Sequence, residues 1–397
     1  MRKTLFIYSA NYLPNIGGVE KYTNNLANQL ELLGVHACIV TNNVFNLAEE
    51  ETLESGATVY RLPCHPLIGG RLPIPKRNAP FKDLLERIYS QPTDYVVVNT
   101  RFYPHTFLGV KHAERHNIKP IVIDHGSAYL TLGSPAIDLA VKAHEHLITA
   151  LLKQHSIDFY GVSNESVKWL QTFGIDGKGV LNNSIDADSY YKSASSRDFR
   201  KELRLNKDDF LVSFTGRLIP EKGINELLET ARKLSDKPSI KFALAGDGPL
   251  MSMLESNNPG NLTLLGRLQA NDIAALLISS DVFCLPTRSE GFSTSLLEAA
   301  ACYTTPIITN VGGVPEMIPN DRFGIILRSQ SSDEIAERIT ELQKSPELNS
   351  EMAQNIGRRV REEFSWHKTA EKTLQACKEA NSDKADLNRT RASTVKG

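Results

Sequence analysis

Apolar segments of strand length alternate with amphipathic helical segments along almost the whole chain. Apolar runs typical of strands occupy residues 4–9, 35–41, 94–99, 120–124, 158–163, 210–216, 240–246, 262–266, 281–286 and 306–310. Several of these runs contain hardly any polar residue, as expected for parallel strands that are covered on both faces. Between them, apolar residues recur every three or four positions, which is the period of a helix with one buried face. The alternation therefore predicts an α/β fold with parallel sheets.

A polar segment interrupts this alternation near the middle of the chain. Residues 182–200 are rich in Ser and Asp, and a new helix and a buried strand follow them. A chain of 397 residues is long enough for two domains of ordinary size. We therefore predict one domain over residues 1–185 and a second over 186–364. Residues 381–397 show no apolar period and are predicted to be a disordered tail.

Charge and cysteine content exclude several classes of protein. Forty-five basic and 46 acidic residues leave a net charge of −1, whereas a general nucleic-acid binder usually carries a basic excess. The five cysteines form no C-x-x-C pair, so the sequence favours neither a zinc ribbon nor a disulfide framework. No apolar run approaches the length of a transmembrane helix, and the apolar run near the N-terminus is shorter than that of a signal peptide. We expect a cytoplasmic protein with reduced thiols.

Three loops that follow predicted strands contain glycines. Gly17 and Gly18 open the first predicted helix, where glycine lets the backbone approach a ligand and free helix N–H groups favour an anion. Gly246 and Gly248 end another strand, but Met251 replaces the third glycine of a dinucleotide-binding pattern. In both loops, a tight strand-to-helix turn without a ligand explains the glycines equally well.

The third such loop, residues 215–223, also carries charge. Arg217 and Lys222 follow Gly216 at the end of the first strand of the second half. A rigid guanidinium and a lysine point charge together suit a diphosphate. The loop does not match a P-loop, and two solvated surface charges remain an alternative interpretation.

The most informative segment is PTRSEGFSTSLLEAAACYTTPIITNVGGVPEMI, residues 286–318. Glu290 follows an apolar strand, Ser293 or Thr294 can cap the next helix, and Glu298 falls in the second turn of that helix. The free N–H groups at the start of the helix offer a place for a phosphate. The two carboxylates on either side can accept hydrogen bonds from vicinal hydroxyls, one from a sugar and one from a ribose. The alternative interpretation is that both glutamates are ordinary surface residues without a ligand, but the whole segment agrees with a sugar-nucleotide site.

These motifs make the chain resemble the retaining glycosyltransferases of family four, which are also called group 1 glycosyl transferases. The resemblance extends over about residues 4–380. The resemblance is strongest over 210–327, where GR-x(3)-EKG, AGDGP, LLGRL and E-x(7)-E follow in order. It implies the GT-B fold, in which two Rossmann-like, doubly wound domains face a central cleft. It also implies that a final helix, residues 365–380, returns to the first domain. One departure from the family is Asn183-Ser184, where many relatives have Asn-Gly.

The resemblance implies roles for individual residues. Arg217, Lys222, Glu290 and His125 would be catalytic, with His125 near the reacting carbon. The donor would be bound by Gly17, Gly18, Gly216, Gly246, Gly248, Arg267, Leu268, Gly291, Phe292, Ser293, Thr294 and Glu298. Arg101, His105 and Tyr129 are expected to face the acceptor.

The reaction implied is transfer of a hexosyl unit from a UDP- or GDP-linked sugar to a glycan or lipid-linked acceptor, with retention at the anomeric carbon. Charge at residues 217 and 222, with the helix start near 293, would stabilise the departing diphosphate. The one Asp-x-Asp sequence, at 186–188, lies in the polar segment between the domains. We therefore expect no metal and no other cofactor.

Residues 60–82 contain five basic residues, five prolines and no acidic residue. This loop-like segment could dock on anionic lipid or on a lipid diphosphate, which would place the enzyme peripherally on the inner face of the membrane. A solvated loop is the alternative. Two other functions are compatible with the fold, namely a nucleotide-sugar epimerase and a binding protein that has lost catalysis. A nicotinamide dehydrogenase fits less well because the glycine-rich loops are incomplete.

Overall fold

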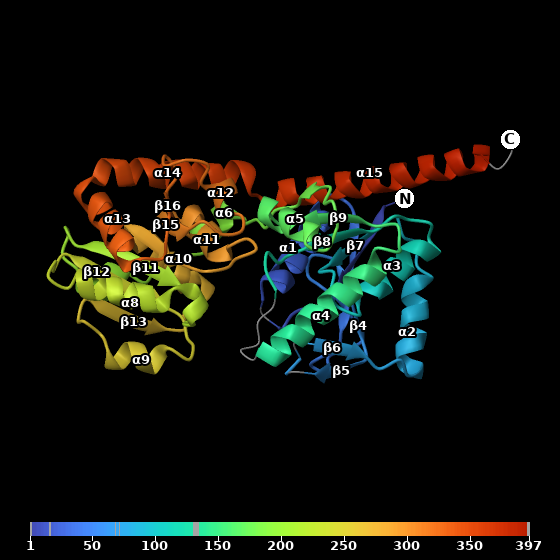
Figure 1. The fold of residues 1–397 in the computed structure, drawn as a ribbon, viewed down its shortest axis with the longest axis horizontal. Helices are drawn as coiled ribbons and strands as arrows, with labels where there is room; N and C mark the ends of the chain where they lie inside the picture. The colour runs from blue at the N-terminus through green and yellow to red at the C-terminus, as the bar shows by residue number, and fades with distance from the viewer. Residues whose placement is uncertain (1, 16, 68, 71, 130–134, 395–397) are drawn as a thin grey trace. The chain divides into compact units, whose positions relative to one another are not determined.

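The computed structural model describes residues 2–15, 17–67, 69–70, 72–129 and 135–394 (Figure 1). The chain divides into two compact units. The first unit comprises Met1–Asn182 and Trp366–Gly397, and the second comprises Asn183–Ser365. The crossing between them therefore lies three residues before the predicted boundary at 185/186.

The first unit is built on an eight-stranded sheet with the order β10-β9-β8-β7-β1-β2-β4-β3. The strands are β1 (Thr4–Ser9), β2 (His36–Asn42), β3 (Glu50–Thr52), β4 (Thr58–Leu62), β7 (Tyr95–Asn99), β8 (Ile121–Asp124), β9 (Asp158–Gly161) and β10 (Gly179–Val180). All pairs are parallel except β3 with β4. The central strands β1, β7 and β8 are buried except at the first residue of β1, because helices cover both faces of the sheet.

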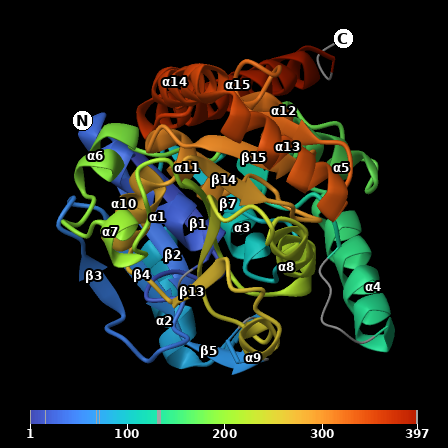
Figure 2. The same cartoon turned by 90° about the vertical axis from the view of Figure 1, so that its left-hand side faces the viewer.

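Six helices surround this sheet. They are α1 (Gly18–Leu32), α2 (Ala79–Tyr89), α3 (Thr106–Arg115), α4 (Pro135–Leu152), α5 (Asn164–Gln171) and α15 (Trp366–Thr394). Helix α15 returns to this unit beside α1, where the rings of Trp366 and Tyr22 lie 5.2 Å apart. Helix α4 crosses in front of the strands of this unit in Figure 1 and lies at the margin of the unit in Figure 2.

The expected disordered tail is wrong for the part that the structure describes. Helix α15 continues to Thr394. The side chain of Asn381 accepts from the Lys119 N–H (3.1 Å) and donates to the Asp94 carbonyl (3.2 Å), and Lys384 Nζ donates to the Ile118 carbonyl (3.0 Å). These polar contacts dock the helix on chain segments that lead into β7 and β8, and hydrophobic periodicity cannot detect them. Residues 395–397 of the predicted tail lie outside the described residues.

The loop interpretation of residues 60–82 is also wrong. Strand β4 includes the first of these residues, and β5 (Cys64–Leu67) and β6 (Leu72–Pro75) form an antiparallel hairpin. Pro66, Pro73 and Pro75 lie in this two-stranded sheet, whose edges need few N–H donors. Arg61 is buried and bonded to Glu51 and to the Ala48 carbonyl, whereas Lys76, Arg77 and Lys82 are exposed. Arg71 lies outside the described residues.

The second unit contains a six-stranded, all-parallel sheet with the order β13-β12-β11-β14-β15-β16. The strands are β11 (Phe210–Thr215), β12 (Ile240–Ala245), β13 (Leu262–Gly266), β14 (Val282–Leu285), β15 (Thr305–Thr309) and β16 (Ile325–Leu327). The order reverses between β11 and β14, and ligands of such sheets bind outside the carboxyl ends of the strands at this reversal.

Short and long helices cover this second sheet. They are α6 (Ala187–Lys192), α7 (Phe199–Glu202), the 3₁₀ turn η1 (Pro220–Lys222), α8 (Ile224–Lys233), α9 (Met251–Ser256), α10 (Ala270–Ser279), α11 (Thr294–Ala301), α12 (Val314–Met317), α13 (Ser332–Lys344) and α14 (Pro346–Glu363).

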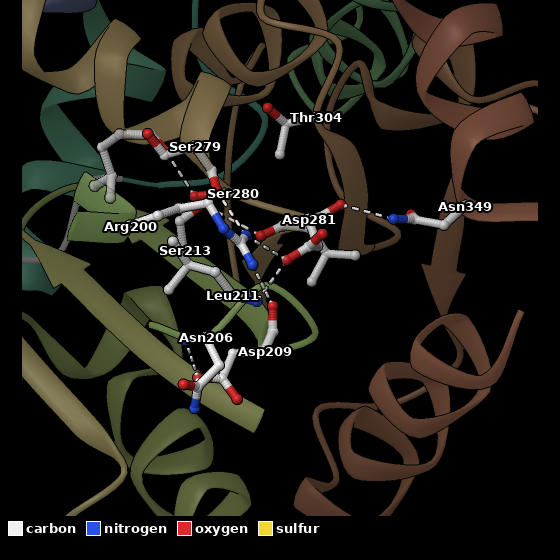
Figure 3. Close-up of polar contacts among 12 residues, drawn as sticks. Arg200, Asn206, Asp209, Leu211, Ser213, Ser279, Ser280, Asp281, Thr304 and Asn349 are labelled. Atoms are coloured by element: carbon white, nitrogen blue, oxygen red, sulfur yellow. Dashed lines mark hydrogen bonds and ion pairs between the residues drawn. The ribbon is translucent and has the colours of Figure 1, made fainter. Parts of the chain in front are cut away.

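A polar cluster fastens the amino-terminal edge of the second sheet (Figure 3). Asp281, just before β14, accepts from the Leu211 N–H (2.6 Å) and from Arg200 Nη1 (3.1 Å), and its carbonyl accepts from Asn349 Nδ2 (3.0 Å). One residue thus joins β11, β14, α7 and α14. This cluster lies at the edge opposite to the strand ends where a ligand would bind, so we assign it a structural role.

Candidate functional site

Backbone segments touch one another at the carboxyl ends of β11 and β12. Gly246 has a φ of +156°, and a Cβ there would lie 1.7 Å from the Gly216 carbonyl oxygen. A Cβ on Gly248 would lie 2.5 Å from the Leu218 carbonyl oxygen. Close packing of the two loops therefore requires both glycines without any ligand, which was one of the two interpretations of this loop. Contact of these glycines with a donor stays a prediction.

The β14 loop is supported in the same way. A Cβ on Gly312 would lie 2.2 Å from the Glu290 carbonyl oxygen, and the Gly313 N–H donates to the Gly291 carbonyl (3.1 Å). The two glycines after β15 thus hold the segment that carries Glu290. Phe292 packs over Gly313 and lies 5.6 Å from the ring of Phe364.

Lys222 and Glu290 come together although 68 residues separate them. Lys222 Nζ donates to Glu290 Oε1 in a partly buried ion pair. Arg217 is exposed in the β11 loop, and its guanidinium has no hydrogen bond or ion pair among the described residues. The β11 and β14 loops therefore present two cations and one carboxylate at the reversal point of the sheet.

Helix α11 begins beside these charges. Its N-cap Ser293 accepts from the Leu296 N–H (3.3 Å), and Thr294 is the first helical residue. Glu298 is half-buried in the second turn. Burial and then the negative charge of Glu298 raise the pKa of the Tyr190 phenol, so Tyr190 of α6 lies close to this carboxylate. Arg267 is exposed and Leu268 half-buried in the loop after β13.

The first unit holds a cavity of about 230 Å³ at the carboxyl ends of β1, β7 and β8. It is lined by Ser9, Ala10, Asn11, Val19, Glu20, Thr100, Arg101, Phe102, Tyr103, Asp124, His125, Gly126, Ala128, Glu145 and Trp169. Two residues predicted for the site, His125 and Arg101, are therefore brought together here.

His125 is held in the cavity wall as a neutral imidazole. Burial lowers the pKa of His125 to about 3. Its Nε2 lies 2.9 Å from Asn99 Oδ1, and its ring lies edge-on to Tyr22 at 4.8 Å. A proton acceptor with such a pKa is weak at neutral pH, so the ring is suited to hydrogen bonding rather than to taking up a proton.

Arg101 is fully buried and already paired. Its guanidinium donates to Asp124 (2.8 Å), Glu145 (3.1 Å) and Thr149 (2.9 Å), and it lies 3.6 Å from the centre of the Phe173 ring. Desolvation raises the pKa of Asp124 even though Arg101 opposes the shift. Arg101 thus lines the cavity as part of a buried charge cluster rather than as a free cation.

The structure does not bring the other two expected acceptor-side residues to this cavity. His105 is buried, with Nε2 2.9 Å from the Val40 carbonyl oxygen, and burial lowers its pKa to about 4. His105 therefore does not line this cavity, and the acceptor role expected of it stays a prediction. The Tyr129 hydroxyl is bonded to His146 Nε2 (2.7 Å) and its ring packs on Trp169 (4.7 Å).

The first glycine loop has one packing glycine and one open position. A Cβ on Gly17 would lie 2.3 Å from Glu20 Oε2, whereas a Cβ on Gly18 would meet nothing within 4 Å. Glu20 is buried in the cavity wall, accepts from Asn15 Nδ2 (3.0 Å), and has a pKa raised by desolvation. Gly17 therefore makes room for Glu20, while Gly18 leaves space that packing does not explain.

Four polar residues of this site were not predicted from the sequence, namely Glu20, Asn99, Asp124 and Glu145. Three of them had a detectable signal. Glu20 follows the glycine pair, and Asn99 and Asp124 each end a buried strand. Glu145 lies in the middle of α4 and becomes a cavity residue only through tertiary packing.

Two features are absent from the described residues. No group of three or more His, Cys, Asp or Glu side chains in the described part of the chain could hold a metal ion. Among the described helices, none is both long and apolar enough to cross a membrane.

The chain is similar to known glycosyltransferases. The family model "Glycosyl transferases group 1" matches residues 195–359, which include the charged loops and α11. The chain is 30% identical over 173 residues to the uncharacterized glycosyltransferase MJ1178 of Methanocaldococcus jannaschii, covering 42% of this chain and 48% of that protein. The group 1 glycosyl transferase model thus covers residues 195–359 of the chain. Together with the relatives named as glycosyltransferases, the match supports a transferase enzyme of the hexosyltransferase type.

A more distant relative and a solved structure cover nearly the whole chain of this glycosyltransferase. One component of human phosphatidylinositol N-acetylglucosaminyltransferase is 24% identical over 379 residues, 91% of this chain and 73% of the relative. Anabaena Alr3699/HepE, solved in complex with UDP-glucose, matches with a TM-score of 0.69 and 16% identity over 94% of this chain and 99% of that one. The likeness to HepE shows the GT-B fold with two Rossmann-like domains.

Proposed function

We propose that this glycosyltransferase moves a hexosyl unit from a UDP- or GDP-linked sugar to a hydroxyl of a glycan or lipid-linked acceptor, with retention at the anomeric carbon. The observation that carries the proposal is the convergence of Arg217, the Lys222–Glu290 pair and the start of α11 at the reversal point of the second sheet. HepE has been solved with UDP-glucose, and the human relative is named as a phosphatidylinositol N-acetylglucosaminyltransferase. Both support a sugar nucleotide as the donor.

Each residue of the second unit has a role in this proposal. Arg217 and Lys222 bind the diphosphate, and the free N–H groups at Ser293 and Thr294 add partial positive charge. Glu290 and the Gly291–Phe292 backbone bind hexose hydroxyls, and Glu298 binds the ribose hydroxyls. Lys222 pairs with Glu290 when no donor is bound. The bound diphosphate must therefore compete with Glu290 for the ammonium group, so that the carboxylate can bind the sugar hydroxyls.

In the proposed reaction, the bond between the anomeric carbon and the diphosphate oxygen breaks. The new bond to the acceptor oxygen forms on the same face of the sugar, and the acceptor proton passes to the released diphosphate. Negative charge grows on the leaving group, so fixed cations near it lower the barrier. Arg217, Lys222 and the start of α11 supply this charge, and we propose that no metal is needed. Full activity in EDTA is the expected result.

We propose that the cavity of the first unit receives the acceptor hydroxyl. Three carboxyl groups, Glu20, Asp124 and Glu145, and one guanidinium line this cavity, which disfavours an anionic group inside it. A neutral hydroxyl suits the cavity better, and the neutral His125 can accept its hydrogen bond.

We also propose peripheral attachment to the inner face of the membrane through the β5–β6 hairpin and the residues after it, where Lys76, Arg77 and Lys82 are exposed. Sedimentation with anionic vesicles at low salt tests this. Replacing the three basic residues by Gln is expected to reduce binding. Equal binding of both proteins, or no binding of the wild type, would contradict it.

Thermal unfolding with UDP, GDP and ADP tests the donor site. A nucleotide at one hundred times its Kd stabilises the protein by about 2.7 kcal/mol, which raises Tm by roughly 5–10 °C. One nucleotide should raise Tm in the wild type and much less in Glu298→Ala. The control is Glu351→Ala, because Glu351 is an exposed glutamate of α14. Absence of any shift in the wild type would contradict the donor site. Conversion of donor without acceptor would instead indicate an epimerase.

A further inference from the structure

We propose that Asn99 is a positioning residue, held by Thr23, that fixes His125 in the tautomer with the proton on Nε2, so that the bare Nδ1 accepts a hydrogen bond from a substrate hydroxyl. The inference rests on the proposed function only in its last step, the substrate hydroxyl. The first steps concern protons inside the first unit and stand by themselves.

The proton of the Thr23 hydroxyl is already used. Thr23 Oγ1 donates to the Val19 carbonyl, one helical turn earlier, at 2.8 Å. The neighbouring Ser9 hydroxyl donates to the Asn11 carbonyl (2.8 Å), so its proton is used as well. A hydroxyl carries one proton, and Thr23 Oγ1 can therefore only accept from the other groups around it.

The amide of Asn99 is oriented by this acceptor. The atom of Asn99 that lies 2.7 Å from Thr23 Oγ1 must be a donor, which makes it Nδ2. The other end of the amide, Oδ1, then faces His125. Asn99 is buried at the end of β7 and Thr23 is buried in α1, so the amide cannot exchange these partners for water.

The tautomer of His125 follows from the amide. Nε2 lies 2.9 Å from Asn99 Oδ1, which only accepts, so Nε2 must carry the proton. A neutral imidazole has one N–H, and Nδ1 therefore keeps its lone pair. Nδ1 has no hydrogen-bond partner among the described residues, and the ring lines the cavity.

The backbone at His125 is fixed too. The Asp124 carboxylate accepts from the N–H groups of His125 and Gly126, and Tyr22 packs against the ring from α1. Glu20, Arg101 and Glu145 are the other charged groups that line this cavity. Because ring and tautomer are both set before substrate arrives, the site presents an acceptor of defined direction. Such a group selects a hydroxyl donor and orients its oxygen.

Nitrogen NMR of the full-length protein labelled with ¹⁵N-histidine tests the first steps without any activity assay. The wild type should show His125 as the neutral Nε2–H tautomer at pH 7.5. Asn99→Asp keeps an acceptor at this position and should keep the tautomer. Asn99→Leu and Thr23→Val remove the fixing groups and should give a mixture of tautomers. A wild type with the proton on Nδ1 would overturn the proposal.

Thr230→Val is the matched control for Thr23→Val. Thr230 is also a buried helix threonine that donates to a carbonyl one turn earlier, Glu226 at 2.7 Å, but it lies in the second unit. It should leave the His125 signal unchanged. Loss of the wild-type tautomer in this control would contradict the proposal that the Thr23–Asn99–His125 hydrogen bonds set the tautomer.

Kinetics then test the last step. With donor saturating, Asn99→Leu and Thr23→Val should lower kcat by roughly 10–100-fold with little change in the KM for donor, while Thr230→Val keeps most of the activity. Unchanged kcat in Asn99→Leu with a changed tautomer would overturn the positioning role. Correct tautomers in a protein without any transferase activity would contradict the proposed function alone.

Discussion

The two units share a parallel-sheet architecture, but the charged side chains at their candidate sites differ in burial and pairing. Each has a parallel sheet with its candidate site at the carboxyl ends of the strands. In the first unit the arginine of the site is buried and paired, and the histidine is neutral. In the second unit Arg217 is exposed and Lys222 has a single partly buried partner. A neutral hydroxyl suits the first environment, and a diphosphate suits the second.

The distribution of histidine and tryptophan allows the stability of the two units to be measured separately. All ten histidines and both tryptophans of the chain belong to the first unit, and the second unit contains neither residue type. Tryptophan fluorescence therefore reports unfolding of the first unit alone. Hydrogen exchange of peptides from residues 183–365 can follow the second unit in the same sample.

The largest expected difference between the units is their response to acid. Burial lowers the pKa of His105 to about 4 and those of His112 and His125 to about 3, against about 6.5 in the unfolded chain. The unfolded state thus binds more protons below pH 6.5, and the stability these groups contribute is full above pH 6.5 and falls as pH drops towards 3–4. The free energy of unfolding should fall by about 1 kcal/mol per histidine per pH unit in that window.

Tryptophan fluorescence against urea between pH 7.5 and 4.5 measures this loss. Exchange of the second unit should change much less over the same range, because no histidine titrates there. An equal loss in both units would contradict the explanation. Replacing His112, whose ring packs edge-on to Phe6 and bonds Tyr8, by Gln should reduce the pH dependence of the first unit.

The buried charge cluster gives the next largest effect. Arg101→Met removes the cation and leaves Asp124 and Glu145 in a dry site. Loss of one partner of a buried ion pair costs about 3–5 kcal/mol, and tryptophan fluorescence should show it as a lower urea midpoint. The control Arg322→Met, at an exposed arginine of the second unit, should change stability by less than about 0.5 kcal/mol. A small effect of Arg101→Met would show that water reaches the cluster.

In the second unit, loss of the charge of Lys222 should lower the catalytic rate rather than the stability. Lys222→Ala removes a partly exposed charge, so the Tm should change little. If the ammonium group stabilises the leaving diphosphate, kcat should fall by roughly 100–1000-fold, as for other fixed groups that stabilise developing negative charge. Steady-state kinetics with the donor identified by thermal shift measures it. A rise in KM at unchanged kcat would show that Lys222 binds donor and transition state equally.

The two units also differ in how far the sequence predicted them. In the second unit, the sequence predicted that Lys222 and Glu290 each follow a buried strand, and the two side chains meet because these strands are neighbours in one parallel sheet. In the first unit, Glu145 reaches the cavity from the middle of α4, and His105 is buried with its ring bonded to the Val40 carbonyl. Such placements depend on how helices pack in the folded unit, and no local sequence pattern predicts this packing. The same holds for the docking of Asn381, where hydrogen bonds replace an apolar stripe.

The smallest predicted effect separates helix capping from ligand binding inside the second unit. Ser293 caps α11 and Ser331 caps α13, each by accepting one backbone N–H. Ser293→Ala and Ser331→Ala should both lower the free energy of unfolding by about 1 kcal/mol. Isothermal titration with the nucleoside diphosphate should show weaker binding only for Ser293→Ala, because only the start of α11 lies beside Lys222 and Glu290. Equal affinities in the two variants would mean that the start of α11 does not contact the phosphates, and the cationic character of this site would then rest on Arg217 and Lys222 alone.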